Sequence, residues 1–287
     1  MMKKKRFLAS LLAGTMLLGL LAGCGSPNGA ESSGPNGGTS AAPGTSDSGG
    51  EGTYVRKTAE GTLTVGLTDT ADSFDPAVSF NSVGMQLVYD SILVKDPFTG
   101  EITSDIAESW DYTDDCTLVI QFRDDVYFSN GEKMTAEDAL YSLNRMITEN
   151  SRWSTFVDAF NFEKSSAEGQ TLTLVTDEPF GPGLNYLTTR YASVLCKSYA
   201  ESCSDEDFWD KPVGTGPYEG KENVSGSHST YTAKADYWGE APEISTITTR
   251  YYAEQSSMML DYENGDLDMA FDLSVSDADR ALNTGIE

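Results

Sequence analysis

The sequence contains little of what metal centres and nucleophilic enzymes usually require. Its 287 residues include one histidine, His228, and four cysteines. No Cys-x-x-Cys motif occurs. Zinc sites are usually built from several cysteine and histidine side chains. The Gly-x-Ser-x-Gly motif of hydrolases and the His-Glu-x-x-His motif of metalloproteases are both absent. We therefore predict that the protein is not an enzyme, needs no cofactor and holds no metal.

Paired carboxylates are the one feature that keeps a secreted hydrolase as a distant alternative. Asp114 and Asp115 form one pair, and Asp124 and Asp125 another, and two carboxylates are what a glycosidase needs. Both pairs lie at the ends of predicted strands, where aspartate is common because its side chain bonds to nearby backbone groups. The structural interpretation is therefore favoured.

Positive charge is also scarce. The chain has 19 Lys and Arg against 45 Asp and Glu, a net charge of −26, and no basic cluster follows Arg6. Because binding to nucleic acid needs a basic face, we predict no nucleic acid partner. The acidity suits the solubility of an exposed extracellular domain.

The only long apolar run lies at the N-terminus, from Phe7 to Leu20, after a basic start. It is too short for a comfortable membrane span, which needs about 20 residues. It ends in Leu-Ala-Gly-Cys, which is typical of a bacterial lipoprotein signal. We predict a signal peptide over residues 1–23 and lipid attachment at Cys24, which would hold the protein at the outer face of the cytoplasmic membrane. The alternative is an ordinary cleavage site beside an incidental cysteine.

Residues 24–58 are predicted to be a tether. Between Gly25 and Gly52, 18 of 28 residues are Gly, Ser or Pro, a composition that cannot bury enough apolar surface to fold. As a flexible coil this stretch would span roughly 30 Å.

The other three cysteines, Cys116, Cys196 and Cys203, are too few to pair completely. A Cys196–Cys203 bridge is possible if their Cα atoms lie within about 7 Å. The sequence alone leaves their state open.

Strand and helix patterns alternate along the rest of the chain, which predicts a mixed α/β fold. Alternating apolar residues or short apolar runs predict strands at 62–67, 117–122, 171–175, 229–235, 244–252 and 267–271. Helices are expected at 85–94, from the N-cap Thr135 to Ile147, at 186–202 and at 255–263.

Residues 213–218, Val-Gly-Thr-Gly-Pro-Tyr, form a conspicuous turn near the middle of this region. The glycines permit positive φ at Gly214 and Gly216, while the ring of Pro217 fixes its own φ near −65°. A phosphate-binding loop requires a different spacing, ending in Gly-Lys-Ser/Thr. We therefore interpret this segment as a structural turn.

The order of several short motifs resembles the extracellular solute-binding proteins of family 5, the peptide-, dipeptide- and nickel-binding components of ABC importers. The resemblance covers about residues 60–275 and depends on the whole series, because each motif alone is weak. The motifs lie at residues 88–93, 105–110, 122–131, 140–143, 213–218, 237–242 and 264–268.

The resemblance implies a two-lobed fold of the type II periplasmic-binding-protein kind. The first lobe would contain residues 59–87 and 206–275, with an inserted subdomain at 88–205. Residues 276–287 would begin a second lobe that is largely missing from this chain.

The resemblance also implies a monomeric receptor that captures a peptide between its lobes and delivers it to ABC permease subunits in the membrane. A ligand would pair with the backbone of Ser79, Phe80 and Asn81 as an added strand. Two alternatives stay open: a same-fold receptor for a nickel chelate or an oligosaccharide, and a sensory or adhesive surface lipoprotein.

Overall fold

The computed structural model describes residues 60–68, 73–78, 82–149, 151–202 and 211–283. The chain divides into two units, Met1–Thr53 and Tyr54–Glu287, and every described residue belongs to the second. The predicted signal segment, Cys24 and the predicted tether lie outside the described residues. None of the described helices combines the length and the apolar character that crossing a bilayer requires.

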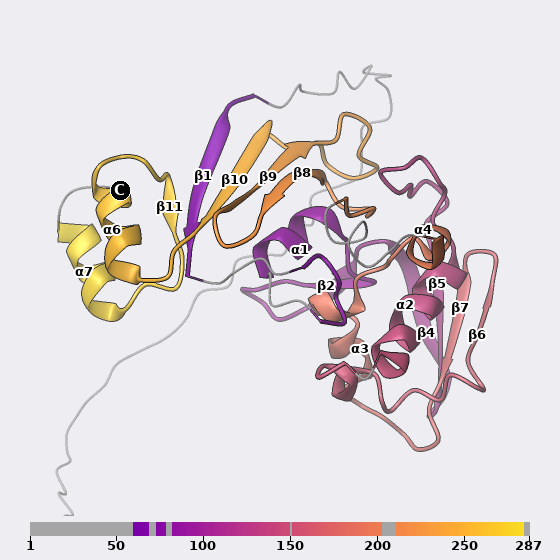
Figure 1. The fold of residues 1–287 in the computed structure, drawn as a ribbon. Helices are drawn as coiled ribbons and strands as arrows, with labels where there is room; N and C mark the ends of the chain where they lie inside the picture. The colour runs from indigo at the N-terminus through magenta and orange to yellow at the C-terminus, as the bar shows by residue number, and fades with distance from the viewer. Residues whose placement is uncertain (1–59, 69–72, 79–81, 150, 203–210, 284–287) are drawn as a thin grey trace, which may run out of the picture. The chain divides into compact units, whose positions relative to one another are not determined.

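A five-stranded mixed sheet is the first layer of the fold (Figure 1). Its strand order is β11-β1-β10-β9-β8, in which β1 is parallel to both neighbours and β9 is antiparallel to β10 and β8. The strands are β1 (Thr62–Leu67), β8 (Tyr218–Val224), β9 (His228–Ala233), β10 (Thr246–Tyr251) and β11 (Met269–Ala270).

The two faces of this sheet differ because apolar and polar residues alternate along its strands. One face carries Val65, Tyr231 and Ile247, which pack with Met85 and Val88 of α1 (Ser82–Val88) in one apolar cluster. The opposite face carries mainly polar side chains. Thr64, Thr248 and Thr230 lie side by side in the register of β1, β10 and β9 on that face.

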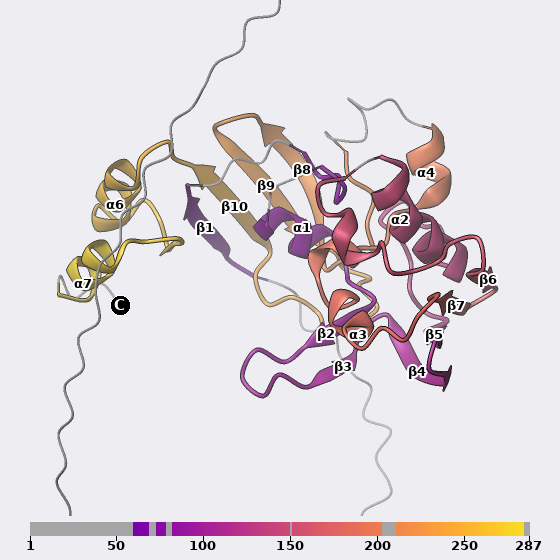
Figure 2. The same ribbon diagram turned by 90° about the horizontal axis from the view of Figure 1, so that it is seen from below.

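A second, four-stranded antiparallel sheet has the order β4-β5-β7-β6 and packs against α2 through a separate apolar cluster. Figure 2 shows α2 lying along this sheet. A small β2–β3 hairpin precedes it. The elements of this region are β2 (Leu93–Lys95), β3 (Ile102–Ser104), β4 (Ala107–Asp114), β5 (Thr117–Phe122), α2 (Ala136–Thr148), η1 (Ser154–Phe156), β6 (Ser166–Glu168), β7 (Thr171–Val175), α3 (Gly183–Tyr186), η2 (Arg190–Ala192) and α4 (Lys197–Ser202).

Helix α2 begins as the sequence predicts. Thr135 has an extended backbone, and its N–H donates to the Asp138 carboxylate across 2.9 Å, one half of a capping box. Ala139 and Leu143 are fully buried on the side that faces the sheet. The helix predicted from the N-cap Thr135 to Ile147 is therefore confirmed.

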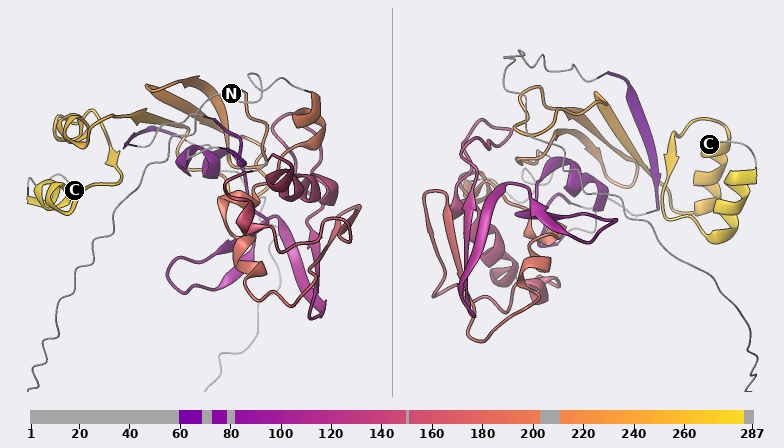
Figure 3. Two further views of the ribbon diagram at one scale, coloured as in Figure 1. Left: turned by 60° about the horizontal axis from the view of Figure 1, so that its bottom comes forward. Right: turned by 180° about the vertical axis from the view of Figure 1, so that it is seen from behind.

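Two helices follow β10. Helix α6 (Gln255–Glu263) connects β10 to β11, and α7 (Val275–Asn283) comes after β11. Figure 3 shows both helices beside β11, at the β1 side of the sheet. Arg280 of α7 pairs with Glu263 of α6. The boundary that the family resemblance places between residues 275 and 276 therefore falls inside a helix.

Two of the predicted helices are partly wrong. Helix α1 ends at Val88 instead of continuing to residue 94, and the chain then turns to β2. Of residues 186–202, only the short segments α3, η2 and α4 are helical. Val194, Leu195 and Cys196 are all buried, and three consecutive buried residues do not fit one helix face.

The structure gives the oxidation state of two of the cysteines. Cys116 and Cys196 are free thiols, and Cys203 lies outside the described residues. Burial raises the pKa of the Cys196 thiol, whose Sγ lies 3.3 Å from the Ser198 hydroxyl. In the structure Cys196 is therefore not bridged.

The turn at residues 213–218 packs directly on the end of α1. Neither Gly214 nor Gly216 is among the glycines with positive φ, so that expectation is wrong. The glycines are needed for close approach instead. A Cβ on Gly214 would lie 2.1 Å from the Val88 carbonyl oxygen, and the Gly216 N–H donates to that oxygen across 2.9 Å.

The carboxylate of Asp90 joins this turn to the loop after β9. It is 7% exposed, and it accepts hydrogen bonds from the Tyr237 hydroxyl at 3.1 Å and the Trp238 indole N–H at 3.0 Å. The Asp90 N–H donates to the Thr215 hydroxyl across 3.3 Å. Lys234 donates to the Thr215 carbonyl across 3.3 Å. The pKa of the Asp90 carboxyl is raised, because the effect of burial exceeds the lowering by the hydrogen bonds with Trp238, Thr215 and Tyr237 and by the charge of Lys234.

Asp105 lies close enough to Asp90 for the two carboxyl groups to interact electrostatically. Burial, together with the charge of Asp90, raises the pKa of the Asp105 carboxyl to about 7, although the backbone N–H of Ser91 opposes the shift. The ordinary aspartate value is about 3.9. The folded chain therefore holds the Asp105 proton more tightly than the unfolded chain does.

Replacing Gly214 by alanine should destabilise the fold strongly. The new Cβ would meet backbone atoms of Val88, which cannot move as a side-chain end can. We expect a loss of about 2 kcal/mol or more in the free energy of unfolding, measured by urea denaturation. Gly181→Ala is the matched control, because nothing lies within 4 Å of its Cβ position, and it should change stability by less than about 0.5 kcal/mol. Equal effects of the two variants would refute the close-approach explanation.

The pH dependence of stability should depend on Asp105. A raised folded-state pKa means that stability is fully present below the unfolded value, near pH 4, and is lost as the pH rises through about 7. Asp105→Asn removes this titration, so the variant should lose less stability than the wild type across that interval. Urea midpoints measured across this pH range test the expectation, and parallel profiles for the two proteins would contradict it.

Candidate functional site

The carboxyl ends of the parallel strands are where ligands usually bind in open α/β sheets. In the five-stranded sheet these ends are Leu67 of β1, Tyr251 of β10 and Ala270 of β11. Because β9 runs antiparallel, its first residue, His228, lies at the same edge. The hairpin between β8 and β9 therefore meets the ends of β1 and β10.

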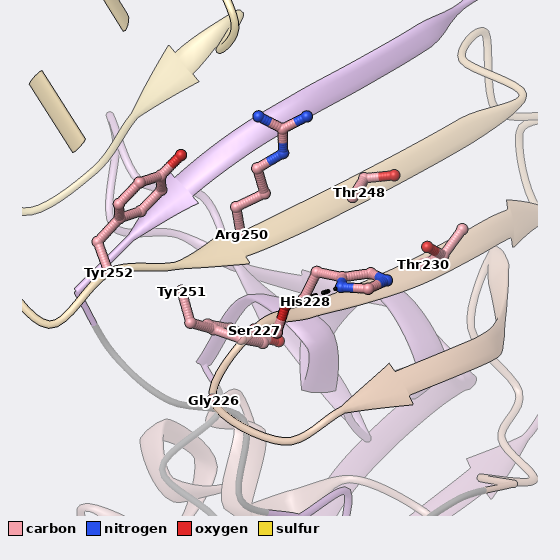
Figure 4. A pocket seen from close by; sticks show the side chains of 8 residues that line it. All are labelled: Gly226, Ser227, His228, Thr230, Thr248, Arg250, Tyr251 and Tyr252. Carbon is pink, nitrogen blue, oxygen red and sulfur yellow. Dashed lines mark hydrogen bonds between the residues drawn. The ribbon is translucent and has the colours of Figure 1, made fainter. Parts of the chain in front are cut away.

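A pocket of about 550 Å³ opens at this edge, on the polar face of the sheet (Figure 4). Figure 4 shows Arg250, Thr248 and Tyr252 on the side of β10 opposite to Tyr251. The pocket is lined by Gly226, Ser227, His228, Thr230, Thr248, Arg250, Tyr251 and Tyr252.

Backbone hydrogen bonds hold the pocket's rim together. The Tyr251 N–H donates to the Ser227 carbonyl across 2.8 Å, and the Tyr252 N–H donates to the Leu67 carbonyl across 2.8 Å. The hairpin, the end of β10 and the end of β1 are thereby joined. The Tyr252 hydroxyl donates to the Asp261 carboxylate of α6 across 2.7 Å, which orients its ring.

Tyr251 anchors the same rim from the buried side. Its hydroxyl lies 2.8 Å from the Ser229 hydroxyl and 3.0 Å from that of Thr249. Ser229 and Thr249 are both completely buried. Since buried polar groups are costly unless they are paired, this network favours a single position of the rim.

The charged groups of the pocket come from both strands. Arg250 is exposed, and His228 lies opposite it in the sheet register. The His228 side chain is 33% exposed, and its Nε2 lies 3.4 Å from the Glu222 carboxylate. Its Nδ1 lies 3.1 Å from the Ser227 hydroxyl. The pocket thus combines a guanidinium and an imidazole with hydroxyl groups, which suits a polar solute.

The ligand-binding residues expected from the family resemblance are not among those that the structure describes. Ser79, Phe80 and Asn81 lie between the described segments that end at Val78 and begin at Ser82. The segment just before them is firmly held, because the buried Asp75 carboxylate pairs with Arg145 across 2.5 Å and accepts from the Ala77 N–H at 2.8 Å. Their role, like lipid attachment at Cys24, stays a prediction.

The sequence analysis did not select Arg250, Tyr252 or Thr248 as site residues. The strand predicted at 229–235 begins one residue after His228, whereas in the structure His228 is the first residue of strand β9. The alternation in the predicted strand 244–252 puts residues 248 and 250 on one face. This alternation is the sequence feature that could have identified these residues as neighbours on one face.

The carboxylate pairs weighed for a hydrolase make local contacts. Asp124 pairs with Lys133, and Asp125 pairs with Arg123 across 2.8 Å. Asp114 accepts from the Cys116 N–H across 2.8 Å. Within the described ranges, no group of three or more His, Cys, Asp or Glu side chains is arranged to hold a metal ion.

Comparison with known proteins identifies one family. The model of the bacterial extracellular solute-binding proteins, family 5, matches residues 101–286. SapA of Escherichia coli K12, a probable ABC transporter periplasmic-binding protein, is 28% identical over 177 residues, which covers 54% of this chain and 32% of SapA. The nickel-binding protein NikA of Staphylococcus aureus is 27% identical over 179 residues, covering 62% of this chain and 34% of NikA.

Other matched relatives are dipeptide- and di/tripeptide-binding proteins. Among solved structures, the murein tripeptide binding protein MppA of Escherichia coli superimposes with a TM-score of 0.72 at 20% identity, over 79% of this chain and 49% of MppA. This likeness shows the fold. The matches extend over about a third of each of the two curated relatives named above and about half of MppA.

Proposed function

The chain belongs to family 5 of the bacterial extracellular solute-binding proteins, and we propose that it captures oligopeptides or dipeptides for an ABC importer. The family match over residues 101–286 is the observation that carries this proposal. Its relatives are peptide-, dipeptide- and nickel-binding periplasmic proteins of such importers. The receptor performs no chemistry in this proposal and delivers its solute to permease subunits in the membrane.

The five-stranded sheet would supply one wall of the binding cleft. Residues 59–87 and 206–275 form the first lobe in this proposal, and residues 88–205 form the inserted subdomain. The polar pocket lies at the carboxyl edge of that sheet. The segment Ser79–Phe80–Asn81 lies outside the described residues and follows β1 in the sequence. A peptide would lie against this edge, with a second lobe closing over it.

The described geometry favours a peptide over a metal ion held directly by side chains. Five of the eight residues that line the pocket at this edge carry a hydroxyl group, and none carries a carboxylate or a thiol. Extended peptides are recognised largely through main-chain hydrogen bonds. A nickel chelate, whose ligands come with the metal, is the alternative that the NikA relationship supports.

Ligand binding should stabilise the protein expressed from the whole open reading frame. A ligand that binds only the folded state contributes about 2.7 kcal/mol at 100 times its Kd, so at least one di- to pentapeptide pool should raise the melting temperature. Nickel with excess histidine, tested in parallel, distinguishes the alternative solute. No shift with either class of ligand would count decisively against the receptor proposal.

The lipid anchor is a separate proposal that rests on the Leu-Ala-Gly-Cys ending of the signal segment. Cys24→Ser removes the sulfur that would carry the lipid, so the protein should move from the membrane fraction to the medium or periplasm. Ser26→Ala, two residues away, serves as the control and should leave membrane retention unchanged. Membrane retention of the Cys24→Ser protein would disprove attachment at this cysteine.

A further inference from the structure

Arg250 and His228 face each other across two neighbouring strands of the pocket. They are register partners in the β9–β10 ladder, and such partners have Cβ atoms about 5 Å apart on the same face. Thr248 and Thr230 form the next partner pair on that face. A guanidinium, an imidazole and two hydroxyls therefore line one continuous part of the pocket (Figure 4).

The protein leaves the Arg250 charge largely without compensation. Arg123, Arg145 and Arg280 each pair with a carboxylate. Arg250 forms no ion pair within the part of the chain that the structure describes. It donates to the main-chain carbonyl of Asp266 across 3.4 Å, a long hydrogen bond, and it also bonds to the Tyr252 hydroxyl. These partners are neutral oxygens, and a solute carboxylate would supply the charged partner that they do not.

An anion bound between the side chains of Arg250 and His228 would accept hydrogen bonds from both. A guanidinium offers two parallel N–H groups that match a carboxylate, and the imidazole and the threonine hydroxyls supply further donors. A carboxylate bound here would therefore be contacted from β9 and β10 together.

We infer that the pocket between β9 and β10 is a subsite for the carboxylate group of the solute, read by Arg250 and His228. The inference rests on the proposed function, since it names the part of a peptide that this edge of the sheet receives. A pocket of about 550 Å³ has the size of a small-molecule site. The free C-terminus of a short peptide is the carboxylate that fits the proposal.

The single histidine of the chain provides a direct test. Because His228 is the only histidine, its imidazole Cε1–H gives a single NMR signal that is assigned without further variants, provided that the protein carries no histidine tag. Acetate is the probe for the subsite. In the wild type the signal should shift saturably with acetate, and Arg250→Gln should weaken this binding about tenfold or more.

Two further variants sharpen the result. Glu222→Gln removes the carboxylate that competes for His228, so acetate should bind about two- to fivefold more tightly. Arg280→Gln is the matched arginine control, because Arg280 lies on α7 and pairs with Glu263, and it should leave acetate binding unchanged. A saturable shift that Arg250→Gln does not weaken would overturn the assignment, as would the absence of any shift.

A peptide pair separates this inference from the function on which it rests. Tri-alanine and its C-terminal amide differ only in the carboxylate. The wild type should therefore bind the amide at least about tenfold more weakly than the acid, and Arg250→Gln should bind both peptides equally weakly. Equal affinities for the acid and the amide would overturn the subsite and leave peptide capture standing. Acetate binding without any peptide binding would support the subsite and count against peptide capture.

Discussion

The buried carboxylate of Asp90 is the interaction on which the arrangement of the five-stranded sheet depends. A carboxylate that is removed from water is costly unless donors surround it. Tyr237 and Trp238 donate to it from the loop after β9, while Thr215 meets the Asp90 backbone from the turn before β8. The segments 88–93, 213–218 and 237–242, which the sequence presents as three separate family motifs, thus converge on one hydrogen-bonded cluster.

This cluster also determines where the pocket lies. The turn can reach Asp90 only because Gly214 and Gly216 let two backbones touch beside Val88. Strand β8 leaves the turn at Tyr218, and Lys234, at the end of β9, returns to it by donating to the Thr215 carbonyl. With the start of β8 and the end of β9 held there, their hairpin extends to the carboxyl edge of β1 and β10. The Ser227 carbonyl accepts from Tyr251 at that edge.

How much of the fold the sequence predicts depends on the position of each element. The strands β1, β5 and β7 occur at the predicted residues, because burial of one face imposes a clear apolar pattern. The helix α6 also occurs at the predicted residues, although only Met258 and Met259 of its side chains are buried. The strands β4 and β8 were missed. Both are sheet edges rich in charged and polar residues, which is how proteins protect edges from aggregation, and a polar edge carries no alternation to detect. The chain leaves the helical path after Val88 because the Val88 carbonyl accepts a hydrogen bond from the Gly216 N–H. That partner is distant in the sequence, so no local pattern predicts it.

The candidate site was less predictable than the fold, because a pocket depends on register between strands that are distant in sequence. Nothing local marks Arg250 until β9 places His228 opposite it. The pairing also bears on which solutes would suit the proposed receptor. A polyanion would be repelled by a chain of net charge −26, even if one carboxylate suited the pocket. A short peptide is zwitterionic, so it would bring a carboxylate for Arg250 and an ammonium group that the net negative charge attracts. Under the proposed function, local positive charge on an acidic protein would thus favour solutes that carry both charges.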